Sequence, residues 1–351
     1  MMEYRKSGNS ELKMSVIGTG CWAFGGGEYW GDQNQKDVND VVHASVAHGI
    51  NYFDTAEAYN EGRSETSLGE AMKGISREKM IIGTKVSPSN CYEGLLEEHC
   101  EASLTRLQTD YIDIYMIHWP IHSHSIRHFT QNPKIINSPP KVSEAFDSLT
   151  KLQKSGKIRH IGISNFSSTR CKEDIPAEIK VIVNELPYNL LCRAIEFDSM
   201  PFCAKQGIGI IGYMTLLQGI LAGIYTSLSD VPIWQRRTRH FNSMGAALCR
   251  HGEKGFERET EEALTAIKGL ALKNGMTMHQ LSIKWAVANP DITCALVGAR
   301  NSKELEENVK TVSEKSDPSI IYELNKITEA LKYAMGNHFD YYESKENDRT
   351  V

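Results

Sequence analysis

Short apolar segments rich in isoleucine and valine alternate along this chain with longer amphipathic segments. The apolar segments largely lack strict polar alternation, which is typical of parallel strands that are buried on both faces. Strands that alternate with helices in this way favour a closed parallel barrel over an open, doubly wound sheet. We therefore expect an α/β fold, a (β/α)8 TIM barrel. Its predicted strands are 16–18, 51–54, 80–85, 112–117, 158–164, 180–185, 209–213 and 293–297.

Three of the segments between the strands carry clear helix patterns. The segment 37–49, DVNDVVHASVAHG, begins with an aspartate suited to a capping position and ends on Gly49, which suits the left-handed position after a helix. The segment 92–107 has a similar pattern, and 142–156 again closes on Gly156. These patterns predict helices that connect consecutive strands.

Further features define the outline of the domain. Residues 4–6 and 11–13 flank the turn SGNS and predict a short N-terminal β-hairpin. Two long segments, 119–141 and 214–256, follow the fourth and seventh predicted strands. Both leave the carboxyl ends of strands, where barrel active sites form, so we expect them to wall or cover one pocket. No interdomain linker interrupts the pattern, which predicts a single domain over 1–351.

Composition argues against several classes of protein. The 351 residues are 40% apolar and 24% charged, which is ordinary for a globular chain. A formal net charge of −5 argues against a nucleic acid or an anionic membrane surface as the main partner. The cysteines are dispersed without a CxxC pair, which favours reduced thiols. The N-terminus lacks the apolar core of a signal peptide and no apolar run has the length of a membrane span, so we expect a cytoplasmic protein.

Titratable residues stand where predicted strands end. Asp54 ends the second strand, Lys85 ends the third and His118 follows the fourth, so all three should face one mouth. Tyr59 lies on the loop just after Asp54. A pair between Asp54 and Lys85 would offset the cost of burying either charge. The same cation should lower the pKa of Tyr59 from about 10 toward neutrality. A neutral His118 could donate a hydrogen bond to a substrate carbonyl.

These groups suit the reduction of a carbonyl. They supply a proton donor, a charge that tunes it and a group that orients the carbonyl oxygen. None of them can deliver a hydride, so this chemistry requires a nicotinamide cofactor. A different interpretation stays open at this point, because Lys85 could instead form a Schiff base in a barrel lyase or isomerase.

Three segments in this order resemble the catalytic-tetrad segments of the aldo-keto reductase family: NYFDTAEAYNEGRSE, IIGTKV and IDIYMIHWP. The resemblance continues through IRHIGISNF, VIVNELPYNLL and CALVGARNSKELEENV, and so covers essentially the whole barrel. It implies a tetrad of Asp54, Tyr59, Lys85 and His118, with Tyr59 as the general acid/base. The substrate pocket it implies is lined by Trp22, Tyr59, His118 and Trp119.

The resemblance also assigns residues to a nicotinamide dinucleotide. Ser164 and Asn165 match positions that hold the nicotinamide carboxamide, and Asn184 falls where the family usually has glutamine. Tyr213 matches an aromatic residue that stacks on the nicotinamide ring. The remaining implied contacts are Cys21 and Trp22 in the first-strand loop, Asp54, the loop residues Met214, Thr215 and Leu216, and the adenosine-gripping residues Gly298, Arg300, Glu304, Glu307 and Asn308.

Two segments depart from the family pattern. Residues 214–216 read Met-Thr-Leu where the family commonly has Ser-Pro-Leu, whose serine contacts the pyrophosphate. Glu304 stands where many members hold the adenosine with arginine or glutamine. An acid there would repel a 2′-phosphate, whereas Arg300 would bind one. On the strength of Arg300 and the resemblance, we predict NADP(H) in preference to NAD(H) as the cofactor.

The sequence thus predicts an NAD(P)-dependent enzyme that interconverts a carbonyl and an alcohol. The alternative is a nicotinamide-binding regulatory subunit with little turnover, since some relatives of this family sit on membrane channels; the intact tetrad favours turnover. Four histidines match no standard zinc spacing, so no metal site is predicted (His118, His122, His124 and His128). The loops suit a sugar or polyol substrate, with small aldehydes and ketones as alternatives, through Trp22, Tyr29, Trp30, Trp119, His122 and Trp234.

Overall fold

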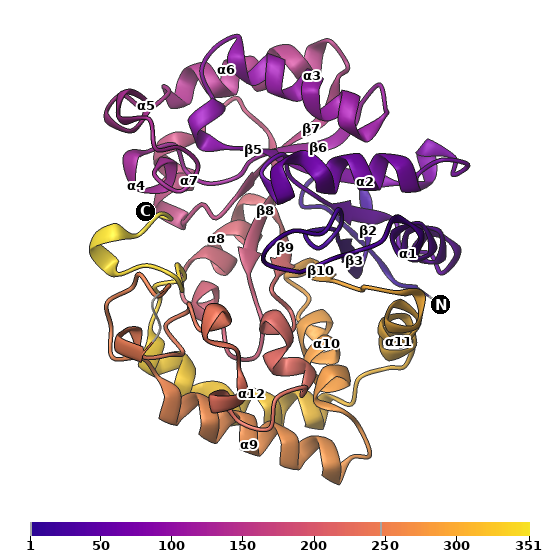
Figure 1. Ribbon diagram of the computed structural model, residues 1–351, viewed down its shortest axis with the longest axis vertical. Coiled ribbons are helices and arrows are strands. Elements are labelled where there is room, and N and C mark those ends of the chain that lie inside the picture. The colour runs from indigo at the N-terminus through magenta and orange to yellow at the C-terminus, as the bar shows by residue number, and fades with distance from the viewer. Residues whose placement is uncertain (1, 246–247) are drawn as a thin grey trace.

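A closed barrel of eight parallel strands forms the centre of the computed structural model, which describes residues 2–245 and 248–351 (Figure 1). The strands follow the order β10-β3-β4-β5-β6-β7-β8-β9 around the barrel. The predicted (β/α)8 fold is confirmed, and every predicted strand has a counterpart within a few residues. The strands are β3 (Ile17–Gly20), β4 (Tyr52–Asp54), β5 (Ile81–Val86), β6 (Ile112–Ile117), β7 (Ile158–Ser164), β8 (Val181–Pro187), β9 (Gly209–Tyr213) and β10 (Ile292–Val297).

An antiparallel hairpin precedes the barrel, with β1 (Tyr4–Lys6) paired to β2 (Lys13–Ser15). The second strand lies two residues later than the predicted 11–13, because the chain turns through a longer loop that the Ser7 N–H closes on the Leu12 carbonyl. This register places Met14 in the inner core of the barrel, where it is fully buried. The hairpin therefore closes the amino-terminal end of the barrel and leaves the carboxyl-terminal end open.

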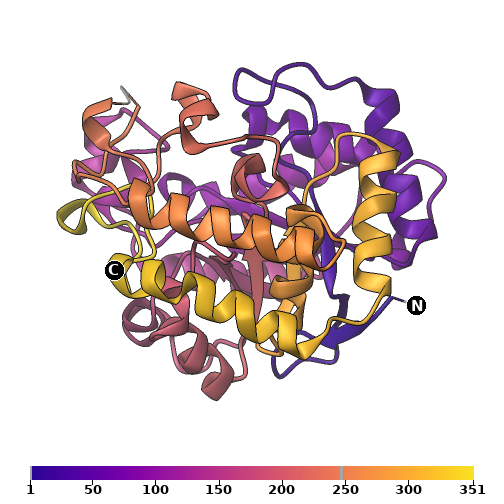
Figure 2. The same cartoon turned by 90° about the horizontal axis from the view of Figure 1, so that it is seen from below.

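Helices cover the outside of the barrel (Figures 1 and 2). Two of them, α9 (Glu257–Lys273) and α12 (Pro318–Met335), run side by side along one flank. Asn34 caps the first helix by accepting from the Asp37 N–H, so the predicted aspartate cap is wrong by three residues. Gly49 and Gly156 have φ of +84° and +79° after their helices, as predicted. The helices are α1 (Gln35–Ala47), α2 (Arg63–Ala71), α3 (Leu95–Leu107), α6 (Val142–Lys154), α7 (Ser168–Asp174), α8 (Ser199–Gln206), α9 (Glu257–Lys273), α10 (Met278–Ala288), α11 (Ser302–Ser313) and α12 (Pro318–Met335).

Side chains that point into the barrel form two layers of different character. Tyr52, Ile114, Met116 and Ile211 are fully buried in an apolar inner core. Asp54 lies two residues after Tyr52, so it shares the inner face of β4 one layer closer to the open mouth. Because inward positions recur every second residue, the pleat of each strand decides which polar residues reach the mouth.

The segments after β6 and β9 are irregular, as predicted. The first contains only the short helices α4 (Ser123–Ile126) and α5 (Pro133–Asn137), and the second contains short 3₁₀ turns in its described part. All eight cysteines are free thiols, and seven of them are buried. Within residues 2–245 and 248–351, no helix combines the length and the apolar character needed to cross a membrane.

Candidate active site

Lys85 is the centre of a buried polar cluster at the mouth of the barrel. Its Nζ lies 2.7 and 2.8 Å from the two carboxylate oxygens of Asp54 and 3.1 Å from the Tyr59 hydroxyl. The third contact of this ammonium group is the Thr55 carbonyl, at 3.0 Å. The pairing of β4 with β5 brings Asp54 opposite Gly83, which places the two charged side chains on adjacent strands. The structure thus brings Asp54, Tyr59 and Lys85 together.

A turn with left-handed backbone holds Tyr59 at the mouth. Asn60 and Glu61, which follow it, have φ of +50° and +58°. Asparagine tolerates this region better than most residues. The Asn60 side chain donates to the carbonyls of Trp22 and Phe24 at 2.8 and 2.9 Å, which ties the turn to the first-strand loop. The Tyr59 ring then stacks on Trp22, with 5.8 Å between the ring centroids.

His118 follows β6 and presents its ring to the edge of Tyr59, with 5.6 Å between centroids. Burial, and then the positive charges of Lys85 and Arg349, lower the pKa of His118 well below its ordinary value. The imidazole is therefore neutral at neutral pH. A neutral imidazole keeps one N–H donor, which is what the orientation of a carbonyl oxygen requires.

The pKa of Tyr59 differs from the sequence prediction. Burial raises it above its ordinary value, and the charges of Asp54 and Glu185 add to the rise, whereas Lys85 lowers it. The expectation that Lys85 brings this pKa toward neutrality is therefore wrong, because burial of the phenol outweighs the charge of Lys85, which Asp54 and Glu185 also oppose. A phenol with a raised pKa is protonated at neutral pH and can act as a proton donor.

Glu185 belongs to the cluster, although no role was predicted for it from the sequence. Its Oε1 lies 3.3 Å from Lys85 Nζ. Asn184, predicted to face the cofactor, lies on the outer side of β8, where its amide donates to the Phe166 carbonyl at 2.8 Å and contacts Cys171. The structure does not bring Asn184 to the mouth, because side chains alternate along a strand and its neighbour points inward instead. The two-residue period of β8 is the signal that would have identified Glu185.

Three residues predicted to hold the nicotinamide form one hydrogen-bonded group. The Tyr213 hydroxyl donates to Asn165 Oδ1 at 2.7 Å. The Asn165 amide donates to the His118 carbonyl at 3.1 Å and to Ser164 Oγ at 2.9 Å. Asn165 has φ of +66°, so the backbone is strained where these contacts hold it. This group lies beside the buried polar cluster around Lys85, since Ser164 Oγ also donates to the Glu185 carbonyl.

The loop after β9 carries Met214, Thr215 and Leu216. Met214 has φ of +60°, which is unusual for a residue with a long side chain. Thr215 is fully buried, and its hydroxyl has no hydrogen-bond partner among the described residues. A buried hydroxyl without a partner is costly, which makes Thr215 a candidate contact for a bound group. Leu216 packs on the core between the barrel and its helices.

Arg300 connects the two sides of the predicted adenosine site. Its guanidinium donates to the carbonyls of Trp30 and Asp32 at 2.7 and 2.5 Å, which fastens the first-strand loop to the start of α11. Glu304 accepts from the Arg300 backbone N–H at 2.9 Å and from the amide of Asn301 at 3.1 Å. Both predicted residues are therefore exposed but already engaged in contacts within the protein.

The other predicted adenosine contacts differ in exposure. Gly298 and Glu307 are exposed, whereas Asn308 is buried and bonds to His279 at 2.7 Å. At the inner edge of the mouth, Cys21 is fully buried, and its backbone N–H donates to the Asp54 carbonyl at 2.8 Å. The structure thus places Glu307 on the surface of α11 and Cys21 in the buried interior next to Asp54.

Aromatic residues wall the mouth on the side of the first-strand loop. Trp22 stacks on Tyr29 with 5.2 Å between centroids, and Trp30 meets both rings edge on. Trp234 from the segment 214–256 packs its ring against Tyr29, with 5.1 Å between centroids. The guanidinium of Arg237, from the same segment, lies 4.5 Å from the Tyr29 ring centre. The first-strand loop and the segment after β9 therefore meet over the cluster.

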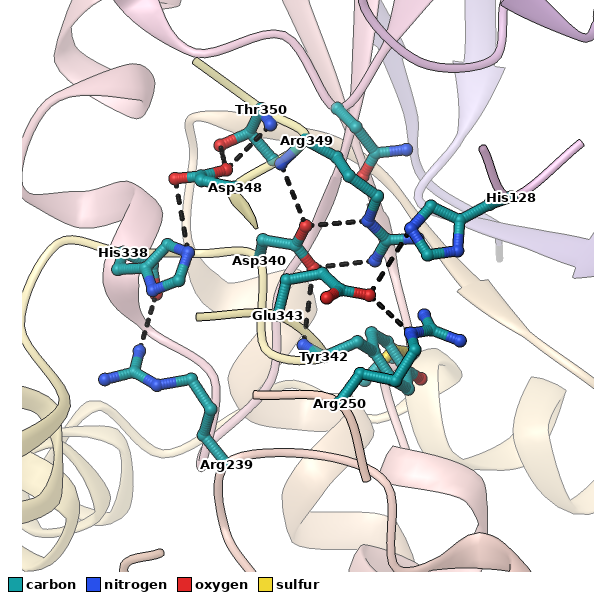
Figure 3. Close-up of polar contacts among 12 residues, drawn as sticks. His128, Arg239, Arg250, His338, Asp340, Tyr342, Glu343, Asp348, Arg349 and Thr350 are labelled. Atoms are coloured by element: carbon teal, nitrogen blue, oxygen red, sulfur yellow. Dashed lines mark hydrogen bonds and ion pairs between the residues drawn. The ribbon is translucent and has the colours of Figure 1, made fainter. Parts of the chain in front are cut away.

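The C-terminal residues 336–351, here called the C-terminal strap, return to the mouth after α12 (Figures 1 and 3). Asp340 accepts two hydrogen bonds from the Arg349 guanidinium, both at 2.7 Å, and both side chains are buried. This guanidinium lies 3.9 Å from the ring centre of Trp119, which is itself buried. The strap is therefore a wall of the site that the sequence did not predict, since nothing local marks 336–351 as part of it.

The C-terminal strap also joins the two long segments that leave β6 and β9 (Figure 3). Glu343 pairs with Arg250 from the second segment and lies 3.4 Å from His128 in the first. Arg239 donates to the His338 carbonyl at 3.2 Å and pairs with Glu253 at 2.8 Å. One buried carboxylate, that of Glu343, therefore contacts both long segments. That both of them wall one pocket stays a prediction.

The inner end of the mouth has the donors and acceptors that a nicotinamide ring with its carboxamide requires. The Tyr213 ring lies beside the fixed amide of Asn165. Three buried polar atoms nearby lack partners among the described residues: Thr215 Oγ1, His118 Nδ1 and Glu185 Oε2. At the other end, Arg300 is the cation that would meet a phosphate group. The chemistry of these residues fits a nicotinamide dinucleotide.

The chain is similar to known proteins over most of its length. The sequence profile of the Aldo/keto reductase family matches residues 16–329. The NADH-specific methylglyoxal reductase of Escherichia coli (strain K12) is 30% identical over 330 residues, 87% of this chain and 92% of that protein. A probable voltage-gated potassium channel subunit beta of Arabidopsis thaliana is 25% identical over 327 residues, 89% of this chain and 91% of that one. An aldo-keto reductase from Klebsiella pneumoniae, solved in complex with NADPH, matches with a TM-score of 0.68 at 21% identity, covering 100% of this chain and 99% of that one. The chain belongs to the Aldo/keto reductase family.

Proposed function

We propose that this protein is an NAD(P)-dependent oxidoreductase that interconverts a carbonyl group and an alcohol. The proposal rests on the 3.1 Å contact between the Tyr59 hydroxyl and Lys85 Nζ, with the neutral ring of His118 beside it. This arrangement surrounds one point with a protonated phenol, a fixed cation and a hydrogen-bond donor, as carbonyl reduction requires. Membership of the family supports the oxidoreductase class.

In this proposal the protein's own residues transfer the proton. A bound nicotinamide supplies or accepts the hydride. The substrate oxygen lies between Tyr59 and His118, and the His118 N–H polarises the carbonyl. Tyr59 gives its proton to that oxygen as the alcohol forms, and Lys85 stabilises the phenolate that remains. In the opposite direction, the same phenolate takes the proton of the alcohol.

We propose a sugar, a polyol or a small aldehyde or ketone as the substrate. The Trp22 ring stacks on Tyr59, and Trp119, the residue after His118, packs its ring on the Arg349 guanidinium. Flat apolar walls beside polar groups suit such molecules. The name of the Escherichia coli relative supports small oxo-aldehydes among them. The free cysteines support a cytoplasmic location for this chemistry.

A cofactor-coupled absorbance screen tests the proposed function. Sugars, polyols, aldehydes and ketones are offered with NAD(H) and with NADP(H), and the Tyr59→Phe variant serves as the matched blank for contaminating activity. Turnover by the wild type alone supports the proposal. Stoichiometric dinucleotide binding without turnover on any substrate would instead favour a regulatory subunit, a role that the name of the Arabidopsis relative suggests.

A Schiff-base enzyme is less consistent with the site. Burial lowers the pKa of Lys85, but Asp54, Glu185 and Tyr59 together outweigh it and hold the pKa above its ordinary value. The amine is therefore protonated, and a protonated amine is not a nucleophile. Borohydride should fail to trap a carbonyl substrate on Lys85, and mass spectrometry of the treated protein checks this point.

We propose that the site prefers NADP(H) to NAD(H), on the strength of Arg300 at the predicted adenosine end. The NADPH-bound Klebsiella structure supports this preference, whereas the name of the NADH-specific relative opposes it. Titration by fluorescence quenching should show tighter binding of NADP(H). Arg300→Met should weaken NADP(H) binding by about 10–100-fold, the value of a charge-assisted contact, and affect NAD(H) much less.

Glu304→Gln is the matched control for the cofactor preference. It removes the acid that opposes a 2′-phosphate and keeps a side chain able to accept from the Arg300 N–H. NADP(H) binding should therefore improve in this variant. A wild type that binds NAD(H) more tightly would show that the Arg300 guanidinium stays with the Trp30 and Asp32 carbonyls and does not reach the phosphate.

A further inference from the structure

Glu185 is a second buried carboxyl group on the ammonium of Lys85. Its Oε1 is 3.3 Å from Lys85 Nζ, its side chain is 3% exposed, and its Oε2 has no partner among the described residues. Asp54 already binds the same ammonium with both of its oxygens. One cation therefore faces two carboxyl groups in a site that water does not reach.

The ammonium of Lys85 has three hydrogens for more than three acceptors. Four groups have an oxygen within 3.3 Å of Lys85 Nζ: the carboxyl groups of Asp54 and Glu185, the Thr55 carbonyl and the Tyr59 hydroxyl. An ionised Glu185 would compete with Tyr59 for the remaining hydrogen. It would also add a negative charge next to the phenolate that Tyr59 forms when it donates its proton. Both effects oppose the proposed chemistry.

We propose that Glu185 is a positioning residue that must stay protonated for Tyr59 to donate its proton, and that its ionisation turns the site off as the pH rises. The proposal rests on the proposed function for the role of Tyr59, but the protonation state of Glu185 is independent of it. A neutral Glu185 leaves the Lys85 ammonium to Asp54 and Tyr59, and its own hydroxyl can donate to a neighbouring carboxylate.

The other titratable groups around Glu185 come from four strands of the barrel and from the Tyr59 turn. Burial and then the charge of Asp54 raise the pKa of Glu185 well above its ordinary value of 4.5, while Lys85 lowers it. Two carboxyl groups that share one site cannot both ionise easily, so one of them keeps a proton. The titratable neighbours are Asp54 and Tyr52 on β4, Lys85 on β5, Tyr59 on its turn, and, further along the barrel, Tyr213 on β9 and Cys294 on β10.

The protonated state has a consequence for stability that needs no substrate. Because the folded-state pKa of Glu185 lies above the unfolded one, the folded protein binds one more proton than the unfolded chain over the interval between them. The contribution of Glu185 to stability is therefore greatest below pH 4.5 and falls as the pH rises toward the folded pKa. A single linked proton changes the unfolding equilibrium constant about tenfold per pH unit within this interval.

The experiment compares wild type with Glu185→Gln in denaturant unfolding at a series of pH values that rise from about 5, just above the ordinary pKa of a glutamate side chain. Glutamine keeps the shape and never ionises, so the wild type should lose stability relative to the variant by about tenfold in the unfolding constant per pH unit. Exposed Glu306→Gln is the matched control and should follow the wild type. Equal slopes for wild type and Glu185→Gln, or a wild type that gains stability relative to the variant with rising pH, would overturn the proposal.

Two further measurements connect Glu185 to its neighbours. In Asp54→Asn, Glu185 becomes the only carboxyl group beside Lys85, so it should ionise and the extra slope of stability with pH should disappear.

In turnover assays, the wild-type rate should fall at high pH with an ionisation that the Glu185→Gln profile lacks. Identical pH profiles would overturn the positioning role of Glu185 even if the stability data show that it holds a proton. Absence of turnover on every substrate would instead count against the proposed function.

Discussion

Tyr59→Phe should reduce turnover by about 10²–10⁴-fold, because general acid catalysis contributes roughly 3 to 5 kcal/mol to barrier lowering. The substitution removes one oxygen and keeps the ring. The stack on Trp22 at 5.8 Å between centroids and the position of Lys85 Nζ, 4.7 Å from the ring centre, should therefore survive. The loss should appear in kcat, with dinucleotide affinity nearly unchanged. Steady-state kinetics and fluorescence titration of the same preparation measure both quantities.

Tyr29→Phe is the matched control for this prediction. It removes the hydroxyl of a phenol in the same aromatic wall, where that hydroxyl donates to Gln218 at 2.6 Å and does not contact Lys85. Its turnover should stay within a small factor of wild type. Turnover near the wild-type value in Tyr59→Phe would show that another group donates the proton, and the role given to Tyr59 would then be wrong.

Lys85→Met should destabilise the protein by roughly 3–5 kcal/mol, the usual cost of removing one partner of a buried ion pair. Lys85 is fully buried, and its loss leaves Asp54 and Glu185 facing each other without a cation. Turnover should fall as well, because no charge remains to stabilise the phenolate of Tyr59. Denaturant unfolding at neutral pH measures the loss of stability. Lys85 lowers the pKa of Glu185, so without it this pKa should rise further and part of the stability should return as the pH is lowered.

Lys284→Met separates this effect from the simple loss of a buried lysine. Lys284 is also buried, but its Nζ donates to the Glu314 carbonyl at 2.8 Å and its nearest carboxylate, that of Glu314, is largely exposed. The cost should therefore be about 1 kcal/mol, since water solvates the carboxylate that remains. Equal destabilisation by the two substitutions would show that the two carboxyl groups beside Lys85 carry no special cost.

The fold and the four catalytic candidates could be predicted from the sequence because short segments of the chain carry the signals for both. Each strand is a short apolar run, and eight such runs that alternate with helices favour the closed barrel that the structure shows. Asp54, Lys85 and His118 stand at or just after the ends of their strands, so the parallel topology alone brings them to one mouth. The helix ends at Gly49 and Gly156 are local in the same sense, since only the backbone conformation of one residue is involved.

The tertiary structure decided which of two adjacent residues reaches the site, how the charges balance and what covers the mouth. Asn184 and Glu185 differ by one position, and only the register of β8 in the barrel turns the carboxyl group inward. Burial, and after it the charges of Asp54 and Glu185, raise the pKa of Tyr59 where the sequence predicted that it would fall. The C-terminal strap reaches Trp119 from more than two hundred residues away, through the buried pair of Asp340 and Arg349. Each of these depends on contacts between distant segments, which the order of residues along the chain does not display.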